Sequence, residues 1–444
     1  MKVDTQLELY KKVSNDGLLI NPPLTFCAKP TFVSLQELLE MLQYNLLATK
    51  LKRQDSLYFN VPFCFSKRCR FCMYRSKTDY TESDLVEYVS RINQEIELRH
   101  SYINGPIRNV YIGGGTPTVL SASQLHSLLF RIQDFGFEEN GERTCEMSPA
   151  TGTEEHVSML YEVGINRLSL GVQSFDHKVL ESANRDYVPD NRIATLVNCA
   201  RAKGYIDINL DLMFGLPNST IENVCDSIRR AIQVGAYSIS IYNYRKVNRA
   251  SSNDDVRQLP DLMKQQFLAA RDVFSALGWE LYAGDENTEY HLFYSPERMR
   301  GTYRYQTSPN CVENQFVHGL GLFANGFSPA VFYTNVGPYK GVCMEDRMFK
   351  VYQMDKNQQI RLGAANFLYS FANRIDGRRF FEAFGVLPVD YFEEEVGMLQ
   401  KNGRLEISND DLVLLPRTHE EHYALQKFFW DQQYMDSFIS HKMT

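Results

Sequence analysis

Strand-like and helix-like segments alternate along the sequence between residues 53 and 250. Strands that alternate with helices pair in parallel through right-handed crossovers, so this alternation indicates an α/β fold. The segment holds six strand–helix units, whereas a complete eight-unit barrel takes ~250 residues. The pattern therefore predicts an incomplete (β/α)6 TIM-like barrel, with a doubly wound open sheet as the alternative. The β-rich stretches are SLYFNV (56–61), NVYIGGG (109–115), ERTCEMSP (142–149), RLSLGVQSF (167–175), DINLDLMFGLP (207–217) and YSISIYNY (237–244).

The sequence outside this core divides into three regions. We expect an N-terminal extension at 1–52 before the strand–helix core at 53–250, and a barrel extension with a connecting segment at 251–344 after it. That last segment begins with a helical pattern and ends in an irregular stretch, HGLGLFANGF. Residues 345–444 change character, because helical patterns are followed by LEISNDDLVLLP (405–416), which is typical of a hairpin. We therefore expect a helical, winged-helix-like C-terminal domain.

The composition sets limits on partners and location. The chain has 444 residues and a formal net charge of −7, so no overall basic character indicates nucleic-acid binding. There is no apolar run of the roughly 18 residues that a membrane span needs, and no secretory signal pattern at the start. We expect a cytoplasmic, reducing location, in which the nine cysteines are free thiols or metal ligands.

Three cysteines lie close together directly after the first predicted strand. Cys64, Cys69 and Cys72 have the spacing C-x4-C-x2-C, and the sequence contains no second C-x2-C pair. A structural zinc site usually takes four protein ligands. A [4Fe–4S] cluster held by three cysteines keeps one iron open for a substrate or cofactor. The spacing thus favours an iron–sulfur cluster, with a zinc site or a chance group of thiols as alternatives.

Polar residues mark the carboxyl ends of the following strands. Thr116 lies in GGGTPT after the second strand, Glu146 ends the third, Gln173 the fourth and Asp211 the fifth. Parallel α/β proteins build their active sites at this edge of the sheet. The pattern therefore predicts a site where these side chains and the three cysteines meet.

The order of these motifs resembles that of radical S-adenosylmethionine (SAM) enzymes. The fuller set NVPFC, YIGGGTPT, LSLGVQSF, NRDY, DLMFGLP and IYNY is similar to the oxygen-independent coproporphyrinogen III dehydrogenase (HemN-like) family. The resemblance covers about residues 53–430, makes 53–250 the radical SAM core, and extends to the C-terminal helices and hairpin.

The resemblance implies a role for each matching residue. Cys64, Cys69 and Cys72 would ligate a [4Fe–4S] cluster whose open iron binds SAM, and reduction would cleave SAM to a 5′-deoxyadenosyl radical. Glycines at a strand end allow backbone amides to come close to such a ligand. The residues that match contacts to the first SAM are Tyr58, Gly114 and Glu146. Those that match contacts to a second SAM are Phe71, Gly115, Thr116, Gln173, Arg185 and Asp211.

The chain departs from the family pattern at several positions. One extra residue separates Cys64 from Cys69, Asn60 replaces a usual histidine, and Arg245 follows IYNY where a small residue is common. Tyr74 stands where the porphyrinogen decarboxylases carry a further cysteine. These differences favour a reaction other than decarboxylation.

Among the relatives that the resemblance brings in are HemN-like (class C) methyltransferases. We therefore expect methyl or methylene transfer to an unsaturated or aromatic small molecule. The alternatives are oxidative decarboxylation of coproporphyrinogen III and a non-enzymatic haem-binding chaperone. We also expect an electron donor such as flavodoxin or ferredoxin, with no nucleic-acid partner and no membrane span. No residue is assigned as a catalytic base.

Overall fold

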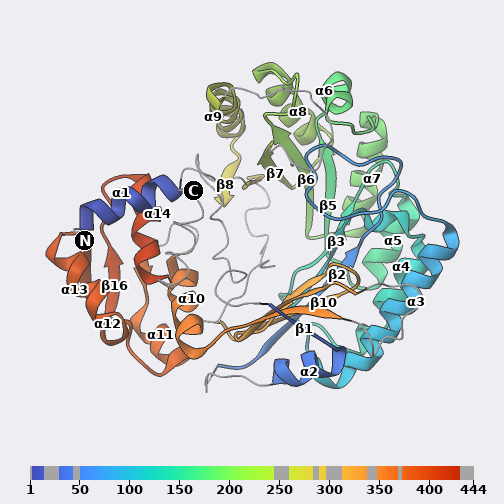
Figure 1. Ribbon diagram of the computed structural model, residues 1–444. Coiled ribbons are helices and arrows are strands. Elements are labelled where there is room, and N and C mark those ends of the chain that lie inside the picture. Colours follow the sequence, from blue (N-terminus) through green and yellow to red (C-terminus); the bar gives the residue numbers. More distant parts are fainter. Residues whose placement is uncertain are drawn as a thin grey trace.

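The computed structural model describes residues 3–14, 30–43, 51–244, 260–283, 290–296, 313–337, 348–368 and 373–430. Within them, one thirteen-stranded mixed sheet forms the centre of the molecule, and a smaller three-stranded sheet lies in the C-terminal region (Figure 1). The predicted connection at 245–261, with Arg245, lies almost entirely outside the described residues. No helix of the described part is long and apolar enough to cross a membrane.

Six consecutive strands of the large sheet are parallel, as the sequence pattern predicts. They are β2 (Gln54–Val61), β3 (Asn109–Gly114), β4 (Arg143–Met147), β5 (Arg167–Gln173), β6 (Asp207–Phe214) and β7 (Ser238–Asn243). The intervening helices are α3 (Glu82–Arg99), α4 (Ala122–Phe130), α5 (Glu154–Glu162), α6 (His177–Ser182), α7 (Asp190–Lys203) and α8 (Ile221–Gln233). Helices α3, α4, α5 and α7 cover the outer face of these strands (Figure 1).

Further strands extend both edges of the parallel array. Beyond β2, the order is β10 (Gln315–Leu320), β11 (Asn325–Phe327), β12 (Val331–Asn335), β13 (Phe349–Gln353) and β1 (Thr31–Val33). Beyond β7, the order is β9 (Tyr290–Tyr294) and β8 (Glu280–Ala283). In the described residues β1 and β8 are not paired with each other, so the barrel is open.

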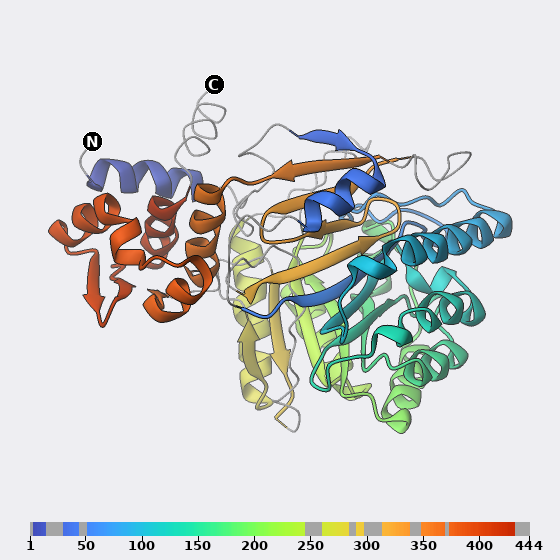
Figure 2. The same ribbon diagram turned by 90° about the horizontal axis from the view of Figure 1, so that it is seen from below.

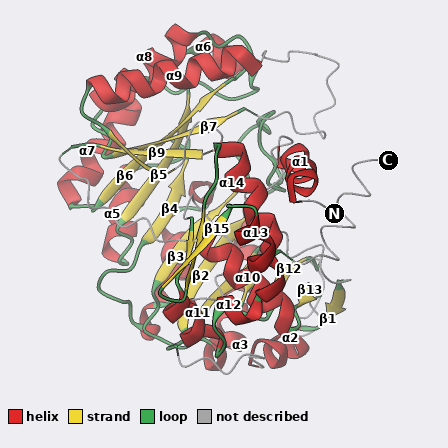
Figure 3. Cartoon of the chain, turned by 90° about the vertical axis from the view of Figure 1, so that its left-hand side faces the viewer, coloured by secondary structure: helices red, strands yellow, loops and turns green. Residues whose placement is uncertain are grey.

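The stretch HGLGLFANGF, expected to be irregular, forms the second half of β10, all of β11 and the turn between them. Strand β10 pairs in parallel with β2, while β11 and β10 are antiparallel. All six residues of β10 are buried, so its sequence shows no alternation between an apolar and a polar face. The helical pattern that precedes it is confirmed as α9 (Pro260–Ala276), which packs beside α8 (Figure 3).

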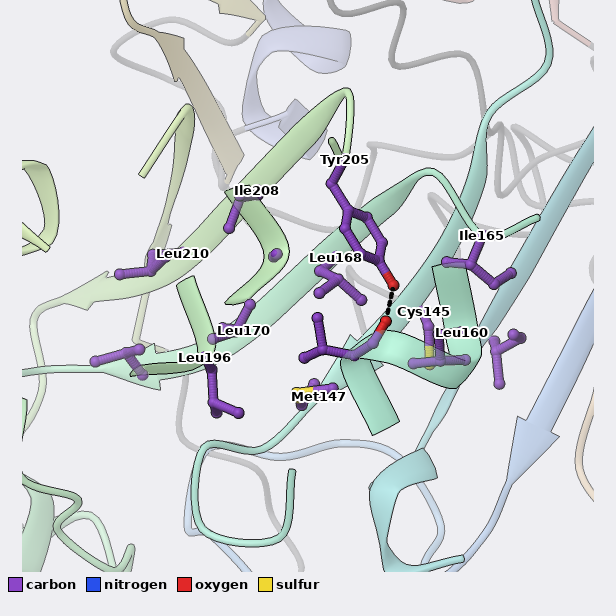
Figure 4. Packing of buried hydrophobic residues seen from close by; sticks show 14 of the residues in the cluster. Cys145, Met147, Leu160, Ile165, Leu168, Leu170, Leu196, Tyr205, Ile208 and Leu210 are labelled. Carbon is purple, nitrogen blue, oxygen red and sulfur yellow. Dashed lines mark hydrogen bonds between the residues drawn. The ribbon is translucent and has the colours of Figure 1, made fainter. Parts of the chain in front are cut away.

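The core between sheet and helices consists of fully buried aliphatic side chains. Leu168 and Leu170 of β5 lie beside Ile208 and Leu210 of β6 (Figure 4). Burial of each such side chain stabilises the fold by roughly 1.5–3 kcal/mol. Tyr205 is also buried, and its hydroxyl donates a hydrogen bond to the Val157 carbonyl oxygen at 2.8 Å. This tie joins the loop before β6 to α5.

The C-terminal region combines short helices with the small antiparallel sheet. The helices are α10 (Lys356–Leu368), α11 (Gly377–Phe384), α12 (Pro388–Tyr391), α13 (Glu393–Lys401) and α14 (His419–Gln426). The strands are β14 (Arg374–Ile375), β15 (Leu405–Ser408) and β16 (Asp411–Leu414). The predicted hairpin is confirmed as β15–β16, and both turn residues, Asn409 and Asp410, have positive φ angles of 52° and 70°. A likeness to winged helices stays a prediction.

The N-terminal segment separates into two pieces with different neighbours. Helix α1 (Val3–Ser14) packs against α14 (Figure 2). The Tyr10 ring lies 5.2 Å from the ring of Phe428, in the 3-10 turn that follows α14. Lys427 donates a hydrogen bond to the Tyr10 carbonyl oxygen at 2.7 Å. Helix α2 (Leu35–Gln43) and β1 instead lie at the edge of the large sheet. The first helix therefore shares a core with the C-terminal region, although the predicted domain bounds keep them apart.

Candidate functional site

The cysteine segment is a loop that starts where β2 ends. Its base is closed by two backbone hydrogen bonds, from the Cys64 amide to the Lys77 carbonyl at 2.9 Å and from the Lys77 amide to the Pro62 carbonyl at 2.8 Å. The Cys72 amide donates to the Cys69 carbonyl at 3.2 Å. These contacts fold residues 62–77 into a closed loop at the carboxyl edge of the sheet.

The three thiols share one local environment. Cys64, Cys69 and Cys72 are partly buried and form no disulfide. Burial raises the pKa of the Cys72 thiol to about 11, the backbone N–H of Tyr74 opposes this rise, and the charges of Cys64 and Cys69 add to it. A negative charge on Cys64 or Cys69 thus opposes ionisation of the Cys72 thiol. A positively charged metal centre would balance that charge.

The donor set suits an iron–sulfur cluster. Cys64, Cys69 and Cys72 would each bind a different iron of a [4Fe–4S] cubane and leave the fourth iron open. A structural zinc site usually takes four protein ligands. The three cysteines thus fit the predicted cluster, and the zinc alternative stays a prediction.

Glu146 and Asp211 place two carboxylates near the carboxyl ends of β4 and β6. The Tyr111 hydroxyl donates to Glu146 Oε1 at 2.7 Å. Asp211 accepts hydrogen bonds from Ser169 Oγ at 3.0 Å and from Asn209 Nδ2 at 2.8 Å. Burial raises the pKa of Glu146 to about 7, the Tyr111 hydrogen bond opposes this rise, and the charge of Asp211 adds to it. Burial also raises the pKa of Asp211. Carboxylates of this kind suit an ammonium, a sulfonium or ribose hydroxyls.

Arg185 and Gln173 lie close to each other at Gly171 of β5. The Arg185 guanidinium donates to the Gly171 carbonyl oxygen and, at 3.4 Å, to the Cys69 sulfur. A side chain on Gly171 would begin 3.2 Å from both the Arg185 guanidinium and the Gln173 amide. Gln173 lies at a β-bulge with a φ angle of 71°, which turns its side chain out of the strand alternation. Arg185 therefore links this corner of the site to a cysteine.

The glycines after β3 serve the chain itself. Gly114 has a φ angle of +108°, and a side chain there would begin 2.2 Å from the Asn60 amide oxygen. A side chain on Gly115 would begin 2.3 Å from the Phe63 carbonyl oxygen. The amides of Gly115 and Thr116 donate to the carbonyls of Val61 and Phe63 at 2.8 and 2.7 Å. These two hydrogen bonds join the end of β3 to the end of β2 and to the start of the cysteine loop.

Tyr58 and Asn60 complete the floor of the site on β2. The Tyr58 hydroxyl donates to the Asn60 amide oxygen at 3.0 Å, and the Asn60 amide donates to the Leu322 carbonyl at 2.5 Å. The Tyr58 ring lies 6.2 Å from the Tyr111 ring, so the contact continues through Tyr111 to Glu146. The sequence argument missed Tyr111 and Ser169. Their signal is the period of two that places them on the same face as Glu146 and Asp211.

Phe71 contacts the protein rather than the centre of the site. Its ring packs on a small apolar cluster that contains Val179, Ala183 and Leu216. This packing fixes the loop between the second and third cysteines against α6. Contacts of Phe71, Gly114, Gly115 and Thr116 with SAM stay predictions.

Comparisons with known proteins agree with this site. The family model described as the Radical SAM superfamily matches residues 61–231. The oxygen-independent coproporphyrinogen III oxidase of Helicobacter pylori is 30% identical over 266 residues, which cover 57% of this chain and 58% of that protein. The haem chaperone HemW of Lactococcus lactis is 27% identical over 295 residues, which cover 65% of this chain and 73% of that protein. The chain thus spans little more than half the length of the oxidase.

A solved structure matches almost the whole chain. The coproporphyrinogen III oxidase HemN of Escherichia coli has a TM-score of 0.75 at 21% identity and covers 94% of this chain and 98% of its own. At this identity the likeness shows the fold. The fold and the cysteine loop agree with the Radical SAM superfamily match to residues 61–231. The chain is similar to the oxygen-independent coproporphyrinogen oxidases and to the haem chaperone HemW, and the radical SAM match implies a [4Fe–4S] cluster and SAM.

Proposed function

We propose that the chain performs radical SAM chemistry on a tetrapyrrole. The observation that carries the chemistry is the group of three partly buried free thiols beside two half-buried carboxylates at one edge of the sheet. When bound, the cluster and SAM supply a one-electron cleavage that yields a 5′-deoxyadenosyl radical. The names of the coproporphyrinogen III oxidases at about 30% identity support the substrate class.

The chain's own residues would bind and orient the cofactors. Cys64, Cys69 and Cys72 would hold the cluster. Glu146, fixed by the Tyr111 hydroxyl, would accept hydrogen bonds from the cationic or hydroxyl-bearing part of SAM. Arg185 would attract a carboxylate, because its guanidinium presents several donors in a plane. An electron donor such as flavodoxin or ferredoxin would supply the electron.

A haem-binding chaperone is a second candidate, and one observation favours it. The chain covers 73% of the length of the Lactococcus lactis HemW but only 58% of the Helicobacter pylori oxidase. Tyr74, which stands where the decarboxylases carry a cysteine, also separates this chain from them. Methyl or methylene transfer is the reaction that the sequence departures favour. Its other support is the set of positions that match contacts to a second SAM. Three of these, Gln173, Arg185 and Asp211, lie near the carboxyl edge described above.

Anaerobic reconstitution with iron, sulfide, SAM and a reductant tests the chemistry. We expect 5′-deoxyadenosine from the wild type and none from Cys72→Ser. Cys199→Ser, which alters a partly buried cysteine on α7 outside the site, is the matched control and should retain the activity. A fully loaded cluster that yields no 5′-deoxyadenosine would contradict the proposal.

The products separate the candidate reactions. Release of carbon dioxide from coproporphyrinogen III, in step with 5′-deoxyadenosine, supports oxidative decarboxylation. Formation of S-adenosylhomocysteine with a gain in product mass supports methyl transfer instead. Tight binding of haem without cleavage of SAM supports the chaperone.

A further inference from the structure

The extra residue between the first two cysteines is taken up by a tight turn. The Lys67 amide donates to the Phe65 carbonyl at 2.8 Å, and Ser66 between them has a φ angle of 56°. Such a left-handed conformation is uncommon for a residue with a side chain and needs support from its surroundings. The Phe65 side chain is 53% exposed, so apolar packing does not supply that support.

Asp186 holds this turn through both of its carboxylate oxygens. Ser66 Oγ donates to Oδ2 at 2.5 Å, and Lys67 Nζ lies 3.0 Å from Oδ1. The Ser66 hydrogen bond lowers the pKa of Asp186, partial burial opposes that, and Lys67 lowers it further. The carboxylate therefore stays charged at neutral pH and keeps both contacts.

The residues just before Asp186 hold the rest of the same loop. The Arg70 backbone amide donates to the Ala183 carbonyl at 3.0 Å, and the side-chain amide of Asn184 donates to the Arg68 carbonyl at 2.8 Å. Arg185 donates to the Cys69 sulfur at 3.4 Å. Each loop residue from 66 to 70 is thus bonded to one of the four residues 183–186. Ala183, Asn184 and Arg185 contact loop residues 68–70, which the shorter cysteine spacing also contains. Asp186 instead contacts Ser66 and Lys67, in the turn that takes up the extra residue.

We propose that Asp186 is a positioning residue that compensates for the extra loop residue and so places Cys64 and Cys69 for the cluster. An exposed ion pair contributes little to the stability of a whole protein, so the effect is local to the loop. Without Asp186 the turn opens, the distance between the first two cysteines varies, and the cluster is held less firmly. The consequence for the cluster rests on the proposed function, whereas the support of the turn does not.

Proteolysis of the full-length chain without a cluster tests the support of the turn. Trypsin cuts after Lys67, Arg68 and Arg70, and peptide mass analysis follows each cut. We expect Asp186→Ala to be cut there roughly three- to tenfold faster than the wild type, as expected for loss of a charge-assisted hydrogen bond and an ion pair. Asp190→Asn is the control, because Asp190 pairs with Arg230 on the same side of the molecule and has no bond to the loop. Cutting of Asp186→Ala at the wild-type rate would overturn the proposal.

Release of iron from the reconstituted chain to a chelator tests the effect on the cluster. We expect roughly three- to tenfold faster release from Asp186→Ala, partial rescue in Asp186→Glu, and no change in Asp190→Asn. The electron paramagnetic resonance signal of the reduced cluster should broaden in Asp186→Ala and recover in Asp186→Glu. If the loop is cut faster while iron release stays unchanged, the positioning role is wrong. If even the wild type holds no iron, the proposed function fails and the trypsin result still stands.

Deletion of Ser66 provides the sharpest check. In the shortened loop the turn is gone, so Asp186→Ala should change neither trypsin cutting nor iron release. An undiminished effect of Asp186→Ala in that background would show that Asp186 acts on something other than the added residue. Where the deletion does not fold, Ser66→Ala and Lys67→Met each remove one partner of Asp186 and should each give part of the Asp186→Ala effect.

Discussion

Acidic residues at the two ends of the parallel strands have different partners. Near the amino ends, Asp55 accepts from Arg53 at 2.6 and 2.7 Å and lies 2.6 Å from the His318 ring, and Asp207 accepts from Arg167 at 2.8 Å. Near the carboxyl ends, Glu146 and Asp211 bond to hydroxyl and amide groups, and no ion pair of theirs occurs among the described residues.

The pKa values follow the same division. Burial alone would raise the pKa of Asp55, but the hydrogen bonds and charges of His318 and Arg53 outweigh it and lower that pKa. Burial also raises the pKa values of Glu146 and Asp211. There the hydrogen bonds of these carboxylates and the charge of Arg167 offset the rise only in part. The first group of acids stabilises the barrel, whereas the second is prepared for a ligand that brings positive charge or hydroxyl groups.

The largest effect on stability is expected at the amino ends. Asp55→Ala leaves His318 and Arg53 without their carboxylate in a buried setting. We expect the free energy of unfolding to fall by about 3 kcal/mol, near the lower limit for a broken buried pair because Arg53 is partly exposed. Urea unfolding measures this loss. Asp134→Ala, at an exposed position, should cost far less, and equal losses in the two variants would remove the distinction between paired and surface acids.

Glu146 should give a pH dependence of stability. Its folded pKa of about 7 lies above the ordinary value of 4.5, so the folded chain binds more protons than the unfolded chain between these pH values. Wild-type stability therefore falls as the pH rises through this window. Glu146→Gln keeps the acceptor for Tyr111 but has no proton to lose. The stability of this variant relative to the wild type should increase from pH 5 to pH 8, and a constant difference would show that Glu146 is not buried as an acid.

The smallest effect on stability is expected for Asp211→Asn. The amide keeps one oxygen for Asn209 or Ser169, and no cation loses an ion pair. We expect the free energy of unfolding to change by less than about 1 kcal/mol, while product formation in the reconstituted enzyme falls. A stability loss as large as that of Asp55→Ala would place Asp211 among the structural acids.

Periodicity and local motifs predicted the six parallel strands and the cysteine loop. Each strand is a short buried run next to an amphipathic helix, and the cysteines lie within nine residues. The same logic placed Glu146, Gln173 and Asp211 at one edge, because parallel strands bring their carboxyl ends together.

Features that depend on distant segments could not be predicted in this way. Strand β10 is buried throughout, so it carries no alternation between apolar and polar residues. Helix α1 joins the C-terminal region through contacts such as that of Tyr10 with Lys427, more than 400 residues away. The support of Ser66 by Asp186 joins two polar surface residues 120 positions apart, and no local pattern marks such a pair.

Binding of SAM to the reduced cluster tests the central claim most directly. Electron paramagnetic resonance of the anaerobically reconstituted, reduced protein is recorded while SAM is added. The spectrum should change with SAM in the wild type, and Glu146→Gln should need more SAM for the same change. A fully loaded cluster whose spectrum stays the same at saturating SAM would contradict the assignment of this edge as a radical SAM site.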